Sequence, residues 1–313
     1  GSLVYYDALL PHVAGPDEID QVSSRGYAMG YIGGGLLLAI NLVMIMVLPE
    51  VFPQLGKGLM TRLSFVTVAF WWFGFTLPLL FKVKEPLRRI EEGEEDLHPI
   101  RASLIRLKKT FLDLKKYRDL SLGLLAFWIY ANGIGTIITM ATIYGKELNF
   151  SDTTLIGTLL MVQILAAPFA MLFGWLAKKI GTKKAIYLSL VIYSLIAVAG
   201  YFLYHEWQFW VLGAAVATVQ GGSQALSRSM IGKMMPKSKS AEFYGFFSVF
   251  EKFASILGPF IFGVVSHLMN ESRLSIASLI LFFGLGLFVL TKVNLERGVK
   301  VASDEEAKLI TVE

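Results

Sequence analysis

Apolar and polar positions alternate along this chain in long blocks rather than in short periods. Eight apolar runs approach the roughly 20 residues that a helix needs to cross a bilayer. We expect one membrane-spanning helix in each run, at 26–48, 63–81, 122–144, 155–177, 185–204, 208–228, 243–267 and 275–290. Ten-residue segments of alternating polarity, which are typical of membrane β-barrels, do not occur. The pattern therefore predicts an all-α polytopic membrane protein with eight transmembrane helices.

Composition agrees with this fold class. Hydrophobic residues make up 55% of the chain, charged residues only 17%, and the mean hydropathy is +0.59. These values lie outside the range of an ordinary soluble domain. The net charge of +5 is expected to face anionic lipid from the loops, so a nucleic-acid partner is not expected. The expected partner is the lipid bilayer.

A long basic loop between the second and third predicted spans orients the chain. Residues 82–121 hold 11 Lys/Arg against 8 Asp/Glu. If this loop is cytoplasmic, the segments on the same side carry 24 Lys/Arg and those on the other side carry 4. Lys and Arg are enriched in cytoplasmic loops. We therefore expect an integral protein of a bacterial cytoplasmic membrane, with both termini in the cytoplasm.

The loop also divides the chain. We expect a two-helix segment at 1–81, the cytoplasmic loop at 82–121, a six-helix half at 122–292 and a cytoplasmic tail at 293–313. Apolar residues in the loop recur at steps of three and four, at Leu104, Leu107, Phe111, Leu114 and Tyr117. This spacing predicts an amphipathic helix. It could lie on the inner membrane surface or pack under the protein, and both alternatives stay open.

Motifs for metal, cofactor or enzyme chemistry are lacking in the sequence. The chain has no Cys, and its four His are scattered. No HExxH, Gly-x-Ser-x-Gly or phosphate-loop motif is present. Gly26, Gly30 and Gly34 recur every four residues, a spacing typical of close helix packing in membranes. They lack the strand context of a dinucleotide site. We expect no metal, no cofactor and no enzymatic activity.

Polar residues inside the predicted spans are the candidate functional residues. The span at 122–144 holds Tyr130, Asn132 and Thr136, and the next holds Gln163. Thr also bonds back to its own helix, so a packing role for this group is an equal alternative. A polar stripe in a membrane helix is expected to face water, substrate or another polar helix. The clearest stripe is formed by three residues spaced four apart, Gln220, Gln224 and Arg228.

Glu251 and Lys252 are ionisable residues within the span at 243–267. Consecutive helical side chains diverge by about 100°, so each needs a partner elsewhere. Ionisable groups inside a membrane are functional candidates. We expect a role in coupling or in a charge network that also includes Arg228, while snorkelling toward the inner surface is the alternative for Lys252.

Several motifs together resemble one known family. They are Tyr6-Asp7-Ala8-Leu9-Leu10-Pro11, Val22-Ser23-Ser24-Arg25-Gly26-Tyr27-Ala28-Met29-Gly30-Tyr31, Gln220-Gly221-Gly222-Ser223-Gln224-Ala225-Leu226-Ser227-Arg228-Ser229, Phe243-Tyr244-Gly245 and Gly258-Pro259. They resemble the vacuole-effluxer-like, autophagy-related branch of the major facilitator superfamily. The resemblance implies twelve helices in two halves. The eight spans would correspond to helices five to twelve, with the first four absent from this chain.

Two positions depart from the pattern of that family and superfamily. The segment from Gly174 to Lys184 resembles the superfamily's inner gate motif, but Lys178 stands where an acidic residue is typical. Asn132 stands where the family often has Asp. The first departure questions the carboxylate contact of the gate. The second removes a possible proton carrier and directs attention to Glu251 or to the absent helices.

The resemblance and the polar spans together predict secondary transport by alternating access. The substrate would be a small polar solute, such as an amino acid or a related metabolite, and protons are one candidate coupling ion. The resemblance places the spans at 122–144 and 208–228 around the central cavity, so Tyr130, Asn132, Thr136, Gln220 and Gln224 would contact the substrate, and Gln163 is a further candidate. The alternative is a membrane scaffold or receptor that keeps a transporter fold without flux.

Overall fold

A computed structural model of the chain describes residues 2–84, 98–269 and 271–310. The described residues are helical almost throughout, and no strand occurs among them. Within this part, seven helices are long and apolar enough to cross a membrane. Their bounds are Ile19–Val51 (α3, a π-helical turn and α4), Lys57–Lys82 (α5), Arg118–Glu147 (α7), Asp152–Ile180 (α8), Thr182–Tyr201 (α9), Lys237–Met269 (which contains α11, Ser240–Met269) and Ser272–Thr291 (α12).

The predicted span at 208–228 forms an eighth long helix, α10, over Glu206–Lys233. It is not among the seven apolar helices, because its C-terminal half is rich in polar and small residues. Gln220, Ser227 and Arg228 are nevertheless buried. Helices α3, α8 and α9 surround α10 and shield these groups from lipid. The fold is therefore the expected all-α membrane bundle, with its most polar helix protected by protein.

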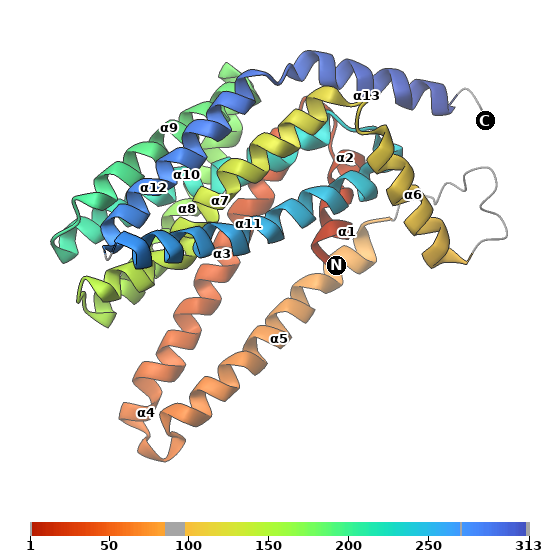
Figure 1. Ribbon diagram of the computed structural model, residues 1–313. Helices are drawn as coiled ribbons and strands as arrows, with labels where there is room; N and C mark the ends of the chain where they lie inside the picture. Colours follow the sequence, from red (N-terminus) through yellow and green to blue (C-terminus); the bar gives the residue numbers. More distant parts are fainter. Residues whose placement is uncertain (1, 85–97, 270, 311–313) are drawn as a thin grey trace.

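Helices α7 to α12 pack around one core (Figure 1). Tyr193 of α9 stacks on Phe283 of α12, with ring centroids 5.4 Å apart. Gly258 of α11 lets α7 approach closely, because a Cβ there would lie 2.5 Å from the carbonyl oxygen of Asn132. Such small-residue contacts replace the hydrophobic driving force that is weak between helices in lipid.

Helices α3 and α5 form a hairpin that extends away from this bundle (Figure 1). Only 6% of the apolar window of α5 is buried, against 50% in α7. Exposed side chains along α5 include Phe65, Phe70 and Trp72. Helix α3 instead packs along α8 and α10, so it joins the hairpin to the bundle. The outer surface of α5 is thus apolar and unburied by the described residues.

The beginning of α3 differs from the predicted span. The apolar run begins at residue 26, whereas the helix begins at Ile19. Its first turns carry Asp20, Ser23 and Ser24, which are buried between helices rather than exposed to solvent in a loop. Hydropathy locates the part of a helix that lies in lipid. It does not identify polar turns whose side chains form hydrogen bonds with neighbouring helices.

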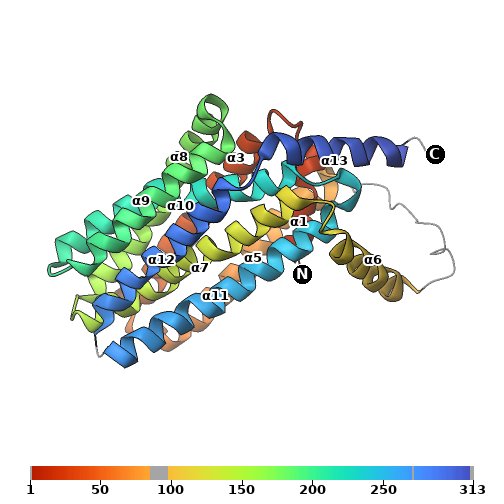
Figure 2. The same ribbon diagram turned by 45° about the horizontal axis from the view of Figure 1, so that its top comes forward.

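Four shorter helices lie at one end of the molecule, where both chain ends are also found (Figures 1 and 2). They are α1 (Ser2–Ala8), α2 (Leu10–Val13), α6 (Pro99–Asp113) and α13 (Leu295–Ile310). Helix α6 falls in the predicted amphipathic segment, whereas the loop residues 85–97 lie outside the described residues. Thr110 of α6 donates a hydrogen bond to Glu242 of α11, while Leu104 and Phe111 are exposed.

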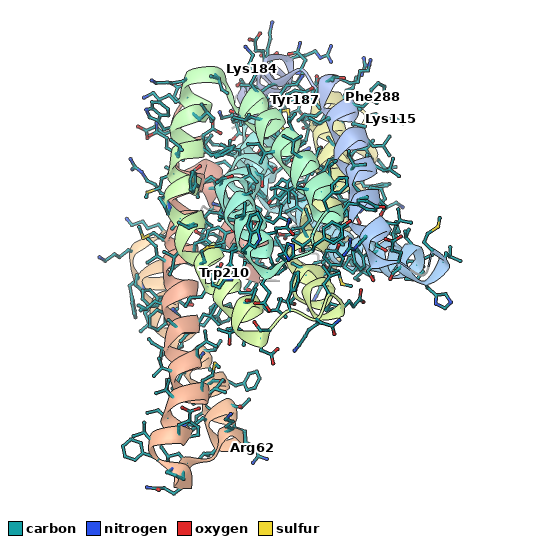
Figure 3. All side chains as sticks on the ribbon, turned by 90° about the vertical axis from the view of Figure 1, so that its left-hand side faces the viewer. Arg62, Lys115, Lys184, Tyr187, Trp210 and Phe288 are labelled. Atoms are coloured by element: carbon teal, nitrogen blue, oxygen red, sulfur yellow. The ribbon has the colours of Figure 1, made fainter. Side chains whose placement is uncertain are left out.

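The opposite end of the molecule carries the tip of the hairpin. Figure 3 shows Arg62 at this tip and Lys184 at the far end of the bundle. At the end of the bundle nearer the hairpin tip, Glu206 at the start of α10 accepts hydrogen bonds from Ser151 and Thr154. The backbone N–H and the hydroxyl of Ser151 both donate at 2.9 Å. Ser151 is also the N-cap of α8. These contacts fasten α8 to α10 at this end.

Candidate functional site

Polar side chains follow one face of α3 and meet the polar stripe of α10. On α3 they are Asp20, Ser23, Tyr27 and Tyr31, at steps of three and four that place them on one side of the helix. Their partners on α10 lie between residues 220 and 233, in reverse order, because the two helices run antiparallel. We call this α3–α10 contact the polar ladder.

The first rung of the polar ladder is a buried carboxylate. Asp20 Oδ2 accepts a hydrogen bond from Thr182 Oγ1 at 2.7 Å and pairs with Lys233 Nζ at 2.6 Å. Asp20 Oδ1 accepts a hydrogen bond from Ser229 Oγ at 2.6 Å. The Asp20 side chain is 7% exposed and that of Lys233 is 15% exposed. Asp20 thus joins α3 to the first turn of α9 and to α10.

The segment that resembles the gate motif has Lys178 in place of an acidic residue, and the first rung shows where a carboxylate contact to this segment comes from. Lys178 is exposed. The motif's Thr182 nevertheless contacts a carboxylate, which comes from Asp20 on α3. Gly174 lies at the same crossing, where a Cβ would be 2.7 Å from the side chain of Ser24. The gate segment therefore contacts α3 through Gly174 and Thr182.

Arg228 is the second rung. Its Nε donates to Ser23 Oγ at 3.0 Å, and its Nη2 donates to the Ser23 carbonyl oxygen at 3.1 Å. Its Nη1 pairs with Asp7 Oδ1 of α1 at 2.9 Å. The guanidinium also lies over the ring of Tyr27, 4.8 Å from its centroid. Arg228 therefore points into the protein and binds two separate segments.

Asp7 is a partner that sequence reasoning missed, although it falls within a family-like motif. Burial raises the pKa of the Asp7 carboxyl above its ordinary value, and this effect outweighs the opposite effect of Arg228. No spacing rule links residue 7 to residue 228. The need of a buried arginine for an acidic partner was the one available signal.

The third rung contains both glutamines of the stripe. Gln220 Nε2 donates to the Tyr31 hydroxyl at 3.0 Å, and that hydroxyl donates to Gln224 Oε1 at 3.0 Å. Gln163 of α8 lies beside this rung, because a Cβ on Gly34 would be 3.3 Å from its Nε2. The structure thus brings Gln163, Gln220 and Gln224 to the same face of α3.

The three predicted packing glycines of α3 differ in their surroundings. A Cβ on Gly26 would lie 3.3 Å from Arg228 Nη2, and one on Gly34 would meet Gln163. A Cβ on Gly30 would meet nothing within 4 Å among the described residues. Two of the three glycines therefore serve the contact with α8 and α10.

The candidate residues of α7 bond mainly within or between helices. Tyr130 and Ser227 hydroxyls are 2.5 Å apart. Asn132 Nδ2 donates to the Trp128 carbonyl, and Thr136 donates to the Asn132 carbonyl. Asn132 and Thr136 lie against Gly258 of α11. In this conformation their geometry matches the packing alternative, while Tyr130 connects α7 to α10.

Glu251 and Lys252 lie on α11 with different exposure. Glu251 is half-buried and close enough to Asp7 and Arg228 to interact with both electrostatically. Lys252 is exposed. Neither side chain makes a hydrogen bond or an ion pair within the described part of the chain. Glu251 therefore joins the surroundings of the second rung, whereas Lys252 is exposed and lies close enough to Glu251 to interact with it electrostatically.

A cavity of about 290 Å³ lies between α7, α8, α9 and α10. Its walls are mainly aliphatic, and its polar positions include Thr158, Gln163 and Gln220. The Thr158 hydroxyl is buried and has no hydrogen-bond partner within the described residues. Gln220 of the third rung and the neighbouring Gln163 therefore also line an internal space. Among the described residues, no group of three His, Cys, Asp or Glu is placed to hold a metal ion.

Comparison with known proteins decides the family. A family model described as vacuole effluxer Atg22 like matches residues 13–303. The chain belongs to this family. It is 37% identical over 305 residues to the MFS-type transporter YxiO of Bacillus subtilis, covering 97% of this chain and 70% of that protein. The MFS is the major facilitator superfamily.

More distant relatives are fungal autophagy-related proteins, in agreement with the family match. Autophagy-related protein 22-1 of Penicillium rubens is 26% identical, over 89% of this chain and 50% of its own length. Autophagy-related protein 22 of Saccharomyces cerevisiae (strain S288c) is 24% identical, over 92% and 60%. The chain thus spans only part of each relative.

A solved structure shows the same fold. A bacterial homologue of the iron transporter ferroportin, in an outward-facing state, has a TM-score of 0.53 at 12% identity. The similarity covers 90% of this chain and 65% of that one. The effluxer-family chain therefore has an MFS-type membrane fold, and it is an integral membrane protein.

Proposed function

We propose that the full-length protein moves a small polar solute, such as an amino acid or related metabolite, across the membrane by alternating access. The observation that carries this proposal is the polar ladder. It concentrates buried hydrogen bonds and two buried ion pairs where the α3–α5 hairpin meets the six-helix bundle. The family's name and the MFS-type relative support transport as the activity.

The polar ladder would act as the cytoplasmic gate in its closed state. Arg228 of the second rung pairs with Asp7 of α1, so this rung lies at the end of the molecule that carries α1, α6 and α13 (Figure 1). The basic residues favour this end as cytoplasmic. Opening toward the cytoplasm would separate Asp20 from Thr182 and Lys233, and Ser23 from Arg228. Cysteine labelling at positions 57 and 146 from the outside only would support this orientation and a bacterial cytoplasmic membrane.

Gln220 and Gln224 would exchange partners during the cycle. Both bond to the Tyr31 hydroxyl in this state. When α3 moves away, their amides would need new partners, since unpaired polar groups are costly away from water. A polar solute supplies such partners. Gln163 would join this binding role, because it lies beside the same rung and lines the same cavity as Gln220.

Glu251 is the proposed coupling group if protons drive transport. It is half-buried near Arg228 and Asp7 and makes no ion pair within the described residues. Its charge would therefore respond to the opening of the second rung. A Glu251→Gln protein that keeps pH-dependent uphill transport would exclude this role.

A ligand-stabilisation screen followed by flux measurement tests the function. The full-length protein is screened with amino acids and related metabolites, and any stabilising compound is then assayed for flux in proteoliposomes. We expect at least one compound to stabilise the protein and to be transported. A protein that binds but never transports its ligand would instead be a receptor or scaffold with a transporter fold.

A further inference from the structure

A second cavity, of about 240 Å³, lies where α7 begins. It is formed by the segment 116–120, by Met234 just after α10, and by the first two turns of α13 at Arg297, Gly298 and Val301. Its volume is several times the ~30 Å³ that one water molecule occupies in the liquid. It can therefore hold a compact chemical group.

The lining of this cavity carries excess positive charge. Three basic residues, Lys116, Arg118 and Arg297, contribute to it, against one acid, Asp119. Lys116 and Arg118 are exposed, and the Arg297 side chain is 50% exposed. Arg118 and Arg297 can thus present N–H donors to a group that enters from the aqueous side.

Asp119, the one acidic residue that lines the cavity, already has hydrogen-bond partners. The Asp119 side chain is 3% exposed. Its Oδ2 accepts from Arg297 Nε at 2.5 Å, and its Oδ1 accepts from Arg297 Nη2 at 2.9 Å and from the Asn294 backbone N–H at 2.8 Å. Arg297 Nη1 has no hydrogen-bond partner within the described residues. Asp119 therefore holds α13 and its arginine in place through hydrogen bonds to Arg297 and Asn294, and it also interacts electrostatically with Arg118.

The chemistry of this site matches a phosphate group. A guanidinium beside an ammonium is a common arrangement for phosphate, and Arg presents several N–H donors in a fixed geometry. The first-turn N–H groups of α7 add a favourable field for an anion. Leu120, Met234 and Val301 give the cavity an apolar wall, which suits a group attached to a carbon skeleton.

We propose that this cavity binds the phosphate group of an anionic compound between α7 and α13. The phosphate can come from a phospholipid headgroup, because basic pockets between membrane helices on the cytoplasmic side are suited to such headgroups. It can also come from a soluble phosphate compound. Binding would tie the tail helix α13 to the start of the six-helix half.

Thermal unfolding of the purified full-length protein in detergent tests the site. The probes are phosphatidylglycerol, phosphatidylcholine and inorganic phosphate, with chloride at matched ionic strength. The test protein is Lys116→Gln/Arg118→Gln, which keeps the Asp119–Arg297 pair. The matched control is Lys115→Gln/Lys237→Gln, which removes two exposed charges outside the cavity.

We expect phosphatidylglycerol to raise the unfolding temperature of the wild type and the control. The shift should fall to half or less in the test protein, and phosphatidylcholine should have little effect. If inorganic phosphate alone reproduces the shift, and the test protein loses it, the ligand is a soluble phosphate compound. Equal shifts in test and control proteins with every probe would overturn the proposal. If the double variant does not fold, Arg118→Gln is compared with Lys115→Gln on the same criteria.

Discussion

The Asp20 carboxylate of α3 lies 2.6 Å from the Lys233 ammonium of α10, and the same Asp20 oxygen lies 2.7 Å from the Thr182 hydroxyl of α9. Three helices therefore meet at one buried carboxylate. The segment that resembles the superfamily's gate motif has Lys178 where an acid is typical, and its Thr182 contacts a carboxylate that α3 supplies.

Loss of this carboxylate is expected to weaken the interface strongly. Asp20→Asn leaves the Lys233 ammonium without its counter-ion, and breaking a buried pair on one side costs about 3–5 kcal/mol. We predict a lower unfolding temperature for Asp20→Asn, with partial recovery in Asp20→Asn/Lys233→Gln. The control is Asp17→Asn, since Asp17 is exposed just before α3. Equal stability of the Asp20 and Asp17 variants would contradict the assignment.

Replacement of both glutamines by leucine tests the substrate contacts. Gln220→Leu/Gln224→Leu removes two hydrogen-bonding groups, each with a net contribution of about 0.5–1.5 kcal/mol. We predict at least a roughly tenfold loss of flux for the compound found in the screen, as 1.4 kcal/mol is a factor of ten. Gln54→Leu, at an exposed position, should transport normally. Wild-type flux in the double variant would exclude a binding role for both residues.

Close helix packing predicts that substitution of one glycine of α11 lowers the unfolding temperature and that substitution of another does not. In Gly258→Ala the new Cβ would fall 2.5 Å from the Asn132 carbonyl oxygen, so α7 and α11 must separate. Overpacking of this kind costs about 1–3 kcal/mol. In Gly245→Ala the Cβ would meet nothing within 4 Å among the described residues. Unfolding temperatures should drop for the first variant only, and a drop of equal size in both would argue against close packing.

The docking of α1 should depend on pH through Asp7. Burial raises the folded-state pKa of its carboxyl above the ordinary value of 3.8. The docked state therefore binds more protons than the undocked state between these two pKa values. The stability contribution of this carboxyl is fully present below its ordinary pKa and is lost as the pH rises through the raised pKa.

Unfolding curves across pH 4–8 check this sign. We predict that the wild type becomes less stable relative to Asp7→Asn as the pH rises. Glu18→Gln, which alters an exposed acid, should follow the wild type in parallel. A wild type that gains stability over Asp7→Asn with rising pH would mean that Arg228 outweighs burial.

Much of this fold follows from local pattern. The eight long helices coincide with eight apolar runs, and spacing alone turned Gln220, Gln224 and Arg228 toward one side. The partners of that side, Asp7 and Tyr31, could not be predicted, because no periodicity relates distant segments. For Asn132 and Thr136 the sequence left packing and binding open. In the structure both side chains bond within α7 and lie against Gly258 of α11, and that contact between distant segments has no local sequence signal.

The central claim is that the polar ladder opens and closes as a gate. Spin labels at Asp17→Cys and Lys184→Cys, both exposed, report the distance between the start of α3 and the start of α9. The chain has no Cys of its own, so labels can be placed singly. A second pair, Lys184→Cys with Lys237→Cys, lies within the six-helix half and serves as control.

Pulsed electron–electron double resonance on these spin-labelled proteins in lipid gives the decisive distance distributions. We predict a short and a longer distance for the 17–184 pair, with Asp20→Asn increasing the longer population, and one unchanged distance for the 184–237 pair. A single 17–184 distance that Asp20→Asn leaves unaltered would contradict the gate.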